Sequence, residues 1–160
     1  MADQNQVIHK TLSEYLKGRS AHVGIEKALK DFPPELYGKK PKGMSHTAWQ
    51  LLEHIRIALH DLLEFCRNPN YKTPNWPDDY WPKSDSPAST KEWDTSVKNL
   101  HKDFQEFEDL VNSPDTDLYA RIPWGDGQTI FREILLAGDH TSYHVGQLIT
   151  LRQLLGAWND

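Results

Sequence analysis

His140 and His144 stand four positions apart in segment 139–148 and are the strongest candidates for metal ligands. In a helix, residues at this spacing lie on one face with their Cβ atoms about 6 Å apart, so their imidazoles can bind one metal ion. The alternative is a pair of partly exposed histidines, which is the commoner outcome for an isolated pair. Here the pair borders the apolar face of its segment, where an unpaired polar ring is costly, and this favours a ligand role.

Two protein ligands rarely hold a metal, so we expect a third from another helix. His54 is the best candidate, because apolar residues flank it in a second periodic segment and it lies on the side predicted to face the interior. His60 lies about 240° further round the same helix and should point elsewhere. Considered alone, His54 would more often be an ordinary histidine at the edge of the core.

The remaining histidines have no partner at ligand spacing, and we interpret them as surface or structural residues: His9, His22, His46 and His101. The single cysteine, Cys66, excludes an intramolecular disulfide and a cysteine-based metal site. Because Cys66 lies near the end of a predicted helix, we expect a small buried core residue rather than a nucleophile.

Further polar residues share the inner face of the last periodic segment. Glu133 and Gln147 project within about 60° of the two histidines, where packing alone would call for Leu or Ala. Gln147 or Asp139 is expected to orient a ligand imidazole, as residues hydrogen-bonded to metal-bound histidines commonly do. The alternative for both is a solvated helix face. No residue is marked with similar clarity as a general acid or base.

Four segments carry apolar residues at helical spacing, separated by loops rich in Pro, Gly and Asn. They are residues 4–31, 45–67, 89–113 and 129–155. Gly18 and Gly24 interrupt the first segment, so we expect a bend in that helix. Four helices of this length predict an all-α fold, a four-helix bundle with long connections, and 160 residues suit a single domain over residues 1–160.

Capping signals support the predicted helix ends. Thr47 with Gln50 and Ser89 with Glu92 each fit a capping box, in which two residues exchange hydrogen bonds at the start of a helix. Gly156 stands just past the last segment, as expected for a C-cap. The connection 71–86 is dense in aromatic residues and prolines, so we expect an ordered flap over one end of the bundle.

The composition excludes several classes of partner. Eighteen basic and 23 acidic residues give a net charge of −5, which argues against binding to nucleic acid or to an anionic membrane surface. No apolar run approaches the roughly 20 residues of a membrane-spanning helix, and the polar N-terminus does not resemble a signal peptide. We therefore expect a cytoplasmic protein.

Two of these segments resemble a known family. Segment 139–148 resembles the last-helix motif of the DinB-like (damage-inducible, YfiT-like) metalloenzyme superfamily, and segment 46–65 resembles its second helix. Segments 125–129 and 154–158 resemble one branch of that family. The resemblance covers nearly the whole chain, and the histidines occur in the same order.

The resemblance implies a four-helix bundle with a three-histidine metal centre near one end, often assembled as a homodimer. Carried over to this sequence, it implies His54, His140 and His144 as the metal ligands. Some relatives are S-transferases or isomerases that use low-molecular-weight thiols such as bacillithiol or mycothiol. Most relatives have no established reaction.

Three neutral imidazoles leave a divalent metal with open coordination positions, the layout of a catalytic rather than a structural site. Imidazole ligands suit zinc, nickel, iron or copper. We expect a metal-dependent transferase that joins a low-molecular-weight thiol to a small electrophile, with residues 76–81 shaping the pocket. The alternatives are a metal-dependent hydrolase and a non-catalytic metal-binding stress-response protein. An acid–base residue near the open position would favour an enzyme, and a purely apolar pocket a binding protein.

Overall fold

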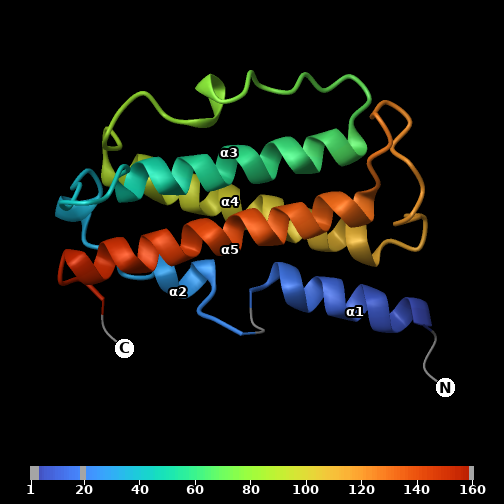
Figure 1. Cartoon of the computed structure of the whole chain (residues 1–160), viewed down its shortest axis with the longest axis horizontal. Coiled ribbons are helices and arrows are strands. Elements are labelled where there is room, and N and C mark those ends of the chain that lie inside the picture. Colours follow the sequence, from blue (N-terminus) through green and yellow to red (C-terminus); the bar gives the residue numbers. More distant parts are fainter. Residues whose placement is uncertain (1–3, 19–20, 159–160) are drawn as a thin grey trace.

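The computed structural model describes residues 4–18 and 21–158 of the chain, and in these residues it contains helices and no named strand (Figure 1). The helices are α1 (Gln4–Leu16), α2 (Ile25–Leu29), α3 (Ala48–Arg67), α4 (Thr90–Asn112) and α5 (Ile130–Leu154). Short 3-10 helices lie in two of the connections, η1 (Pro34–Leu36) and η2 (Asp78–Tyr80). The predicted all-α fold class is confirmed.

The first predicted segment is two helices rather than one bent helix. Gly18 adopts φ +60°, in the left-handed region where glycine is favoured, and α1 ends just before it. Gly24 is extended, with φ −80° and ψ 170°, and directly precedes α2. A regular helix cannot pass through either conformation, so the expectation of one continuous helix was wrong.

Side-chain caps fix the starts of the long helices. The Thr47 hydroxyl accepts a hydrogen bond from the Gln50 N–H, and the Gln50 side chain accepts one from the Thr47 N–H, so this capping box is confirmed. Ser89 caps α4 in the same way, but the Glu92 carboxylate accepts from the N–H of Ala88 instead of that of Ser89. The second box is therefore only half formed.

The direction of the helices explains the long connection between α3 and α4. These two helices pack side by side and run parallel, so residues 68–89 must return along the length of α3 (Figure 1). A helix of 20 residues is about 30 Å long. The expected flap therefore lies along α3 instead of over one end of the bundle.

The core lies between α3, α4 and α5, with α1 and α2 completing one side. Its fully buried apolar residues include Leu51, Leu52, Ile55, Leu59, Leu63, Leu100, Phe107, Ile134 and Leu148. Burying a side chain of this size contributes about 1.5–3 kcal/mol. None of the described helices is both long enough and apolar enough to cross a lipid bilayer.

Arg152 holds α2 against α5. Its buried guanidinium donates hydrogen bonds to the carbonyls of Ala28 and Lys30, at 3.0 Å and 2.8 Å, and its Nε donates to the Ala157 carbonyl at 3.1 Å. Carbonyls at the end of a helix have no hydrogen-bond donor within the helix, and the Arg152 side chain supplies the donors here. A helix as short as α2 is thus fixed by tertiary contacts.

Candidate metal centre

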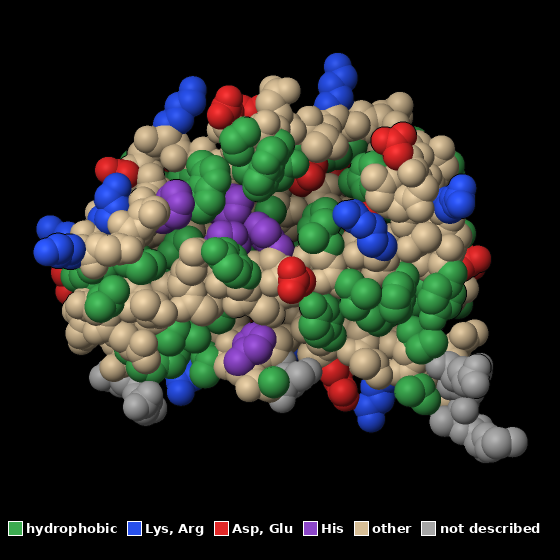
Figure 2. Space-filling model, viewed as in Figure 1, with side chains coloured by type: hydrophobic (Ala, Val, Ile, Leu, Met, Phe, Trp, Pro, Cys, Tyr) green, Lys and Arg blue, Asp and Glu red, His purple; other side chains and the backbone are tan. Residues whose placement is uncertain are grey.

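Three histidines from two helices meet in the middle of the bundle. His54 comes from α3, and His140 and His144 lie one turn apart on α5. One ring nitrogen from each lies within 4.8 Å of the other two. His54 is 2% exposed and His144 is 7% exposed. Figure 2 shows a group of histidine side chains between α3 and α5, partly covered by hydrophobic side chains.

Hydrogen bonds fix which nitrogen of two of these rings carries a proton. The Nδ1 of His54 lies 2.9 Å from the carbonyl oxygen of Tyr80, and the Nδ1 of His144 lies 2.7 Å from Oε1 of Gln147. Both oxygens can only accept, so each Nδ1 donates its hydrogen. In the neutral rings the lone pair is therefore on Nε2, the form of histidine that binds a metal.

The spacing of the nitrogens fits a tetrahedral ion. The Nε2 atoms of His54 and His140 are 3.0 Å apart. Nitrogens bound to one tetrahedral zinc at 2.0–2.1 Å are separated by about 3.3 Å. One separation in the cluster is 3.0 Å and none exceeds 4.8 Å, so the nitrogens lie close to the spacing that one ion requires. The residues present fit a divalent metal.

Burial keeps these imidazoles neutral at physiological pH. Burial, with a smaller effect of nearby imidazoles, lowers the pKa of His54 and of His140 to about 4, although the hydrogen bond to the Tyr80 carbonyl opposes this for His54. Burial also lowers the pKa of His144, against the opposing effect of its hydrogen bond to Gln147. A metal competes with protons for the same nitrogens, so a neutral cluster at pH 7 is ready to bind one.

The connection along α3 supplies two of the contacts around His54. Tyr80 gives its carbonyl to His54 and donates its hydroxyl to Oδ2 of Asp61 at 2.7 Å. Trp81 stacks flat on the His54 ring, with the ring centroids 3.8 Å apart and the planes 2° apart. The aromatic density of this segment was the only sequence signal for these contacts.

His46 lies on the other face of Trp81, at a centroid distance of 3.9 Å and an angle of 14°. We expected a surface or structural residue at this position, whereas the structure places the imidazole next to the site. Ligand spacing could not reveal His46, because it lies in the loop before α3 and its position depends on tertiary packing. His60 does point away from the cluster, as predicted, with its Nδ1 3.2 Å from Asp103.

The two residues expected to orient a ligand behave differently. Gln147 makes the hydrogen bond to His144, so this contact is as predicted. Asp139 is exposed and has no hydrogen bond to any of the three ring systems within the described residues. Asp139 therefore lies on a solvated helix face, which was the alternative considered for it.

Glu133 and Cys66 belong to the core at the other end of α5. Glu133 is 1% exposed and pairs with Arg132 at 2.7 Å, and no hydrogen bond joins it to the described histidines of the cluster. Burial raises the pKa of Cys66 to about 12, and the charge of Glu133 adds to this effect. The thiol is therefore protonated at neutral pH, and the expectation of a buried core cysteine is confirmed.

A pocket of about 400 Å³ lies between the loop before α3 and the second half of α5; none of the three clustered histidines lines it, but Gln147, which hydrogen-bonds His144, does. Its lining includes Met44, His46, Leu51, Tyr143, Gln147 and Thr150. The ring of Tyr143 stands edge-on to that of His144, with the centroids 4.9 Å apart. The apolar Met44 and Leu51 stand among polar side chains in this lining, and the volume lies within the range of small-molecule sites.

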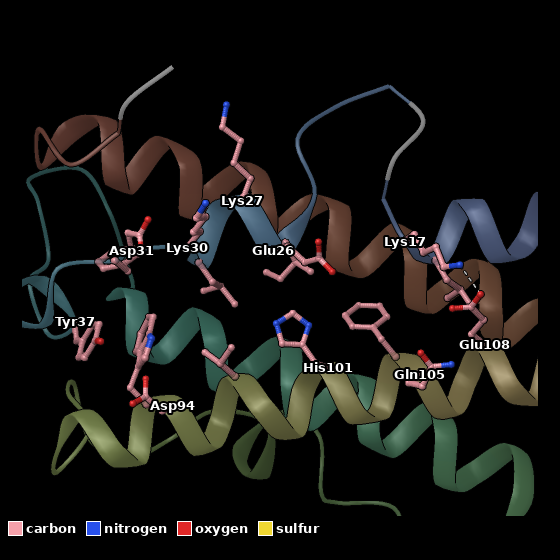
Figure 3. A pocket seen from close by; sticks show the side chains of 17 residues that line it. Lys17, Glu26, Lys27, Lys30, Asp31, Tyr37, Asp94, His101, Gln105 and Glu108 are labelled. Carbon is pink, nitrogen blue, oxygen red and sulfur yellow. Dashed lines mark ion pairs between the residues drawn. The ribbon is translucent and has the colours of Figure 1, made fainter.

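A larger groove of about 1250 Å³ lies on another side of the bundle, between α4 and the pair α1 and α2 (Figure 3). His101 projects from α4 toward α2, and Lys17 forms an ion pair with Glu108 at 2.5 Å (Figure 3). None of the three clustered histidines lines this groove. Its lining mixes lysines with acidic residues, so it offers no single charge to a ligand.

Comparison with known proteins identifies a family. The family model described as "DinB superfamily" matches residues 21–148, which include all three clustered histidines. A crystal structure of a candidate DinB family member from Exiguobacterium sibiricum 255-15 has a TM-score of 0.54 and 16% identity, covering 100% of this chain and 97% of that one. At this identity the likeness shows the fold alone. No curated protein matches the chain.

Proposed function

The chain belongs to the DinB superfamily, and from this premise we propose that it binds one divalent metal ion through the Nε2 atoms of His54, His140 and His144. The observation that carries the proposal is the fixed orientation of two of these rings. Tyr80 and Gln147 hold the Nδ1 hydrogens of His54 and His144, which leaves their Nε2 lone pairs free to bind.

A divalent metal with three neutral imidazole ligands keeps its full charge and lowers the pKa of a thiol or a water molecule bound in an open position. The protein's own contribution is orientation and exclusion of water. Trp81 covers one face of His54 and restricts access from that side. We take the pocket lined by Gln147, the hydrogen-bond partner of His144, as the approach of a ligand to the cluster, and imidazole ligation suits zinc, nickel or iron.

We further propose a metal-dependent transferase that acts with a low-molecular-weight thiol on a small electrophile. The cluster contains no anionic ligand, so it favours an anion such as a thiolate in the open position. The pocket of about 400 Å³ suits a small molecule. The rings of Trp81 and Tyr143 stand edge-on to that of His144, with the centroids 6.1 Å and 4.9 Å away, so the cluster has aromatic surroundings.

Metal-dependent hydrolysis is the second candidate, and His46 is the observation that favours it. This imidazole lines the pocket and has no hydrogen-bond partner among the described residues, so it is free to exchange a proton with a substrate or water. The polar groups of His46, Tyr143 and Gln147 in the pocket speak against a non-catalytic metal-binding protein.

Cobalt substitution distinguishes the two reactions. The cobalt-loaded protein is titrated with bacillithiol, glutathione or a simple dithiol while the near-ultraviolet spectrum is recorded. A thiolate-to-cobalt absorption band is the result expected for the transferase. If no thiol changes the spectrum while carboxylate or hydroxide does, hydrolysis becomes the better proposal.

A further inference from the structure

The orientation of Gln147 leaves hydrogen-bond donors in the pocket beside the cluster. Its Oε1 is engaged by the Nδ1–H of His144, so the amide nitrogen carries two hydrogens that no other described residue accepts. Gln147 also lines the pocket. A ligand that enters the pocket therefore meets a donor at this wall.

His46, which also lines the pocket, provides a second donor. Its ring rests on Trp81 and makes no hydrogen bond to the described residues. Burial lowers the pKa of His46, and the charge of Lys40 lowers it further, so the ring is neutral at pH 7 and carries one N–H. The pocket thus offers two hydrogen-bond donors from its lining.

The charged residues around the pocket also favour an anionic ligand. The described lining of the pocket contains no aspartate or glutamate. The segment 38–46, which forms one of its walls, carries Lys39, Lys40 and Lys42 and no acidic residue, although the chain as a whole has a net charge of −5. Figure 2 shows basic side chains gathered at the left end of the molecule, over this segment. Exposed lysines attract anions to the pocket.

We propose that this pocket binds the carboxylate group of a small organic ligand whose other end reaches the histidine cluster. The proposal gives the chemical class of the substrate. It rests on the proposed function, because the other end of the ligand would bind the metal held by the three histidines. Gln147 lines the pocket and also hydrogen-bonds His144 at 2.7 Å, so the carboxylate subsite lies one side chain away from the cluster and a short carbon chain can span the distance. The carboxylate belongs either to the thiol or to the electrophile.

Two thiols of equal length test the proposal. The cobalt-loaded protein is titrated with 3-mercaptopropionate and with 3-mercapto-1-propanol, and the thiolate-to-cobalt band gives both dissociation constants. We expect the carboxylate to bind at least tenfold more tightly. Lys40→Gln should reduce this preference at least threefold, and His46→Phe, which keeps a ring on Trp81, should do the same.

Two further variants test whether the position of the removed charge matters and whether the pocket itself binds the carboxylate. Lys91→Gln removes the same charge from an exposed position on α4 and should leave the preference unchanged. Gly146→Leu should abolish the preference, because Gly146 lines the pocket and a Cβ added there meets no atom within 4 Å. Bound cobalt, measured in every variant, should remain at the wild-type level.

The outcomes separate this proposal from the thiol-transferase function. Equal affinities for the two thiols, within twofold, would overturn the carboxylate subsite while leaving thiol binding intact. If neither thiol changes the spectrum, propionate is titrated into zinc-loaded protein and the side-chain amide signals of Gln147 are followed by NMR. A shift that Lys40→Gln removes assigns the carboxylate to the electrophile, and no shift would overturn the subsite.

Discussion

The Nε2 atoms of His54 and His140 face each other at 3.0 Å across the contact between α3 and α5. The Tyr80 carbonyl engages the Nδ1 hydrogen of His54, so its Nε2 carries a lone pair. Without a metal, this lone pair is satisfied only when His140 Nε2 holds a proton and donates it. With a metal, both nitrogens become ligands, and His140 stays a neutral imidazole because its hydrogen moves to Nδ1; a ring that gains a second proton can no longer bind the metal. The contact is therefore a site of competition between protons and metal.

The metal-free protein should lose stability as the pH falls from about 6.5 to about 4. In the unfolded chain histidines have a pKa near 6.5, whereas burial lowers the pKa of His54 and His140 to about 4. Within this window the unfolded state binds more protons, so the free energy of unfolding decreases, by up to about 1.4 kcal/mol per pH unit for each histidine. Urea unfolding of the metal-free protein at several pH values measures the effect.

The doubly substituted His54→Gln, His140→Gln protein is the control for that experiment. Its free energy of unfolding should fall less steeply than that of the wild type over the same pH range, because it lacks the two buried imidazoles. Carboxylates elsewhere titrate equally in both proteins, so they do not contribute to the difference. Identical slopes in the two proteins would contradict the assignment of the effect to this pair.

Replacing Gln147 with Leu should weaken zinc binding by about 10–100-fold, because His144 loses the acceptor that orients its ring. Gln147→Glu keeps an acceptor oxygen and should retain most of the affinity. Asp139→Asn, at an exposed position directly before His140, should have no effect. Competition with a zinc indicator gives the dissociation constants. The orienting role would be refuted by a Gln147→Leu protein with wild-type affinity.

Two glycines on α5 should respond in opposite ways to substitution by Ala. A Cβ at Gly146 meets nothing within 4 Å, so Gly146→Ala should stabilise the protein by about 0.5–1 kcal/mol. A Cβ at Gly138 would lie 2.1 Å from Cε1 of Tyr15, so Gly138→Ala should push α1 from α5 and destabilise by about 1–3 kcal/mol. Chemical denaturation measures both. Equal effects of the two substitutions would show that α1 does not pack this closely on α5.

Local sequence signals predicted the helical part of the site well. His140 and His144 could be recognised because four-residue spacing fixes two side chains on one helical face. His54 needed its apolar neighbours as well as the expectation of a third ligand. The starts of α3 and α5 were also predictable, because Thr47 and Thr129 accept hydrogen bonds from backbone N–H groups within the next turn.

The parts that depend on tertiary packing could not be predicted from the sequence. The Tyr80 carbonyl reaches His54 only because α3 and α4 run parallel and the connection returns along α3. His46 joins the site through Trp81, which lies outside the periodic segments, and His46 itself precedes the first turn of α3. The division of the first segment into α1 and α2 depends on the conformation of Gly18, which sequence spacing does not encode.

The metal content of the purified protein tests the central proposal most directly. The protein is prepared without a histidine tag, loaded with zinc, separated from free metal and analysed by elemental mass spectrometry. We expect about one zinc per chain in the wild type and a loss of bound zinc in His54→Ala, His140→Ala and His144→Ala. His60→Ala, on the same helix as His54 but paired with Asp103, is the matched control and should keep full occupancy. A His54→Ala protein that retains one zinc per chain would contradict the proposed three-histidine site.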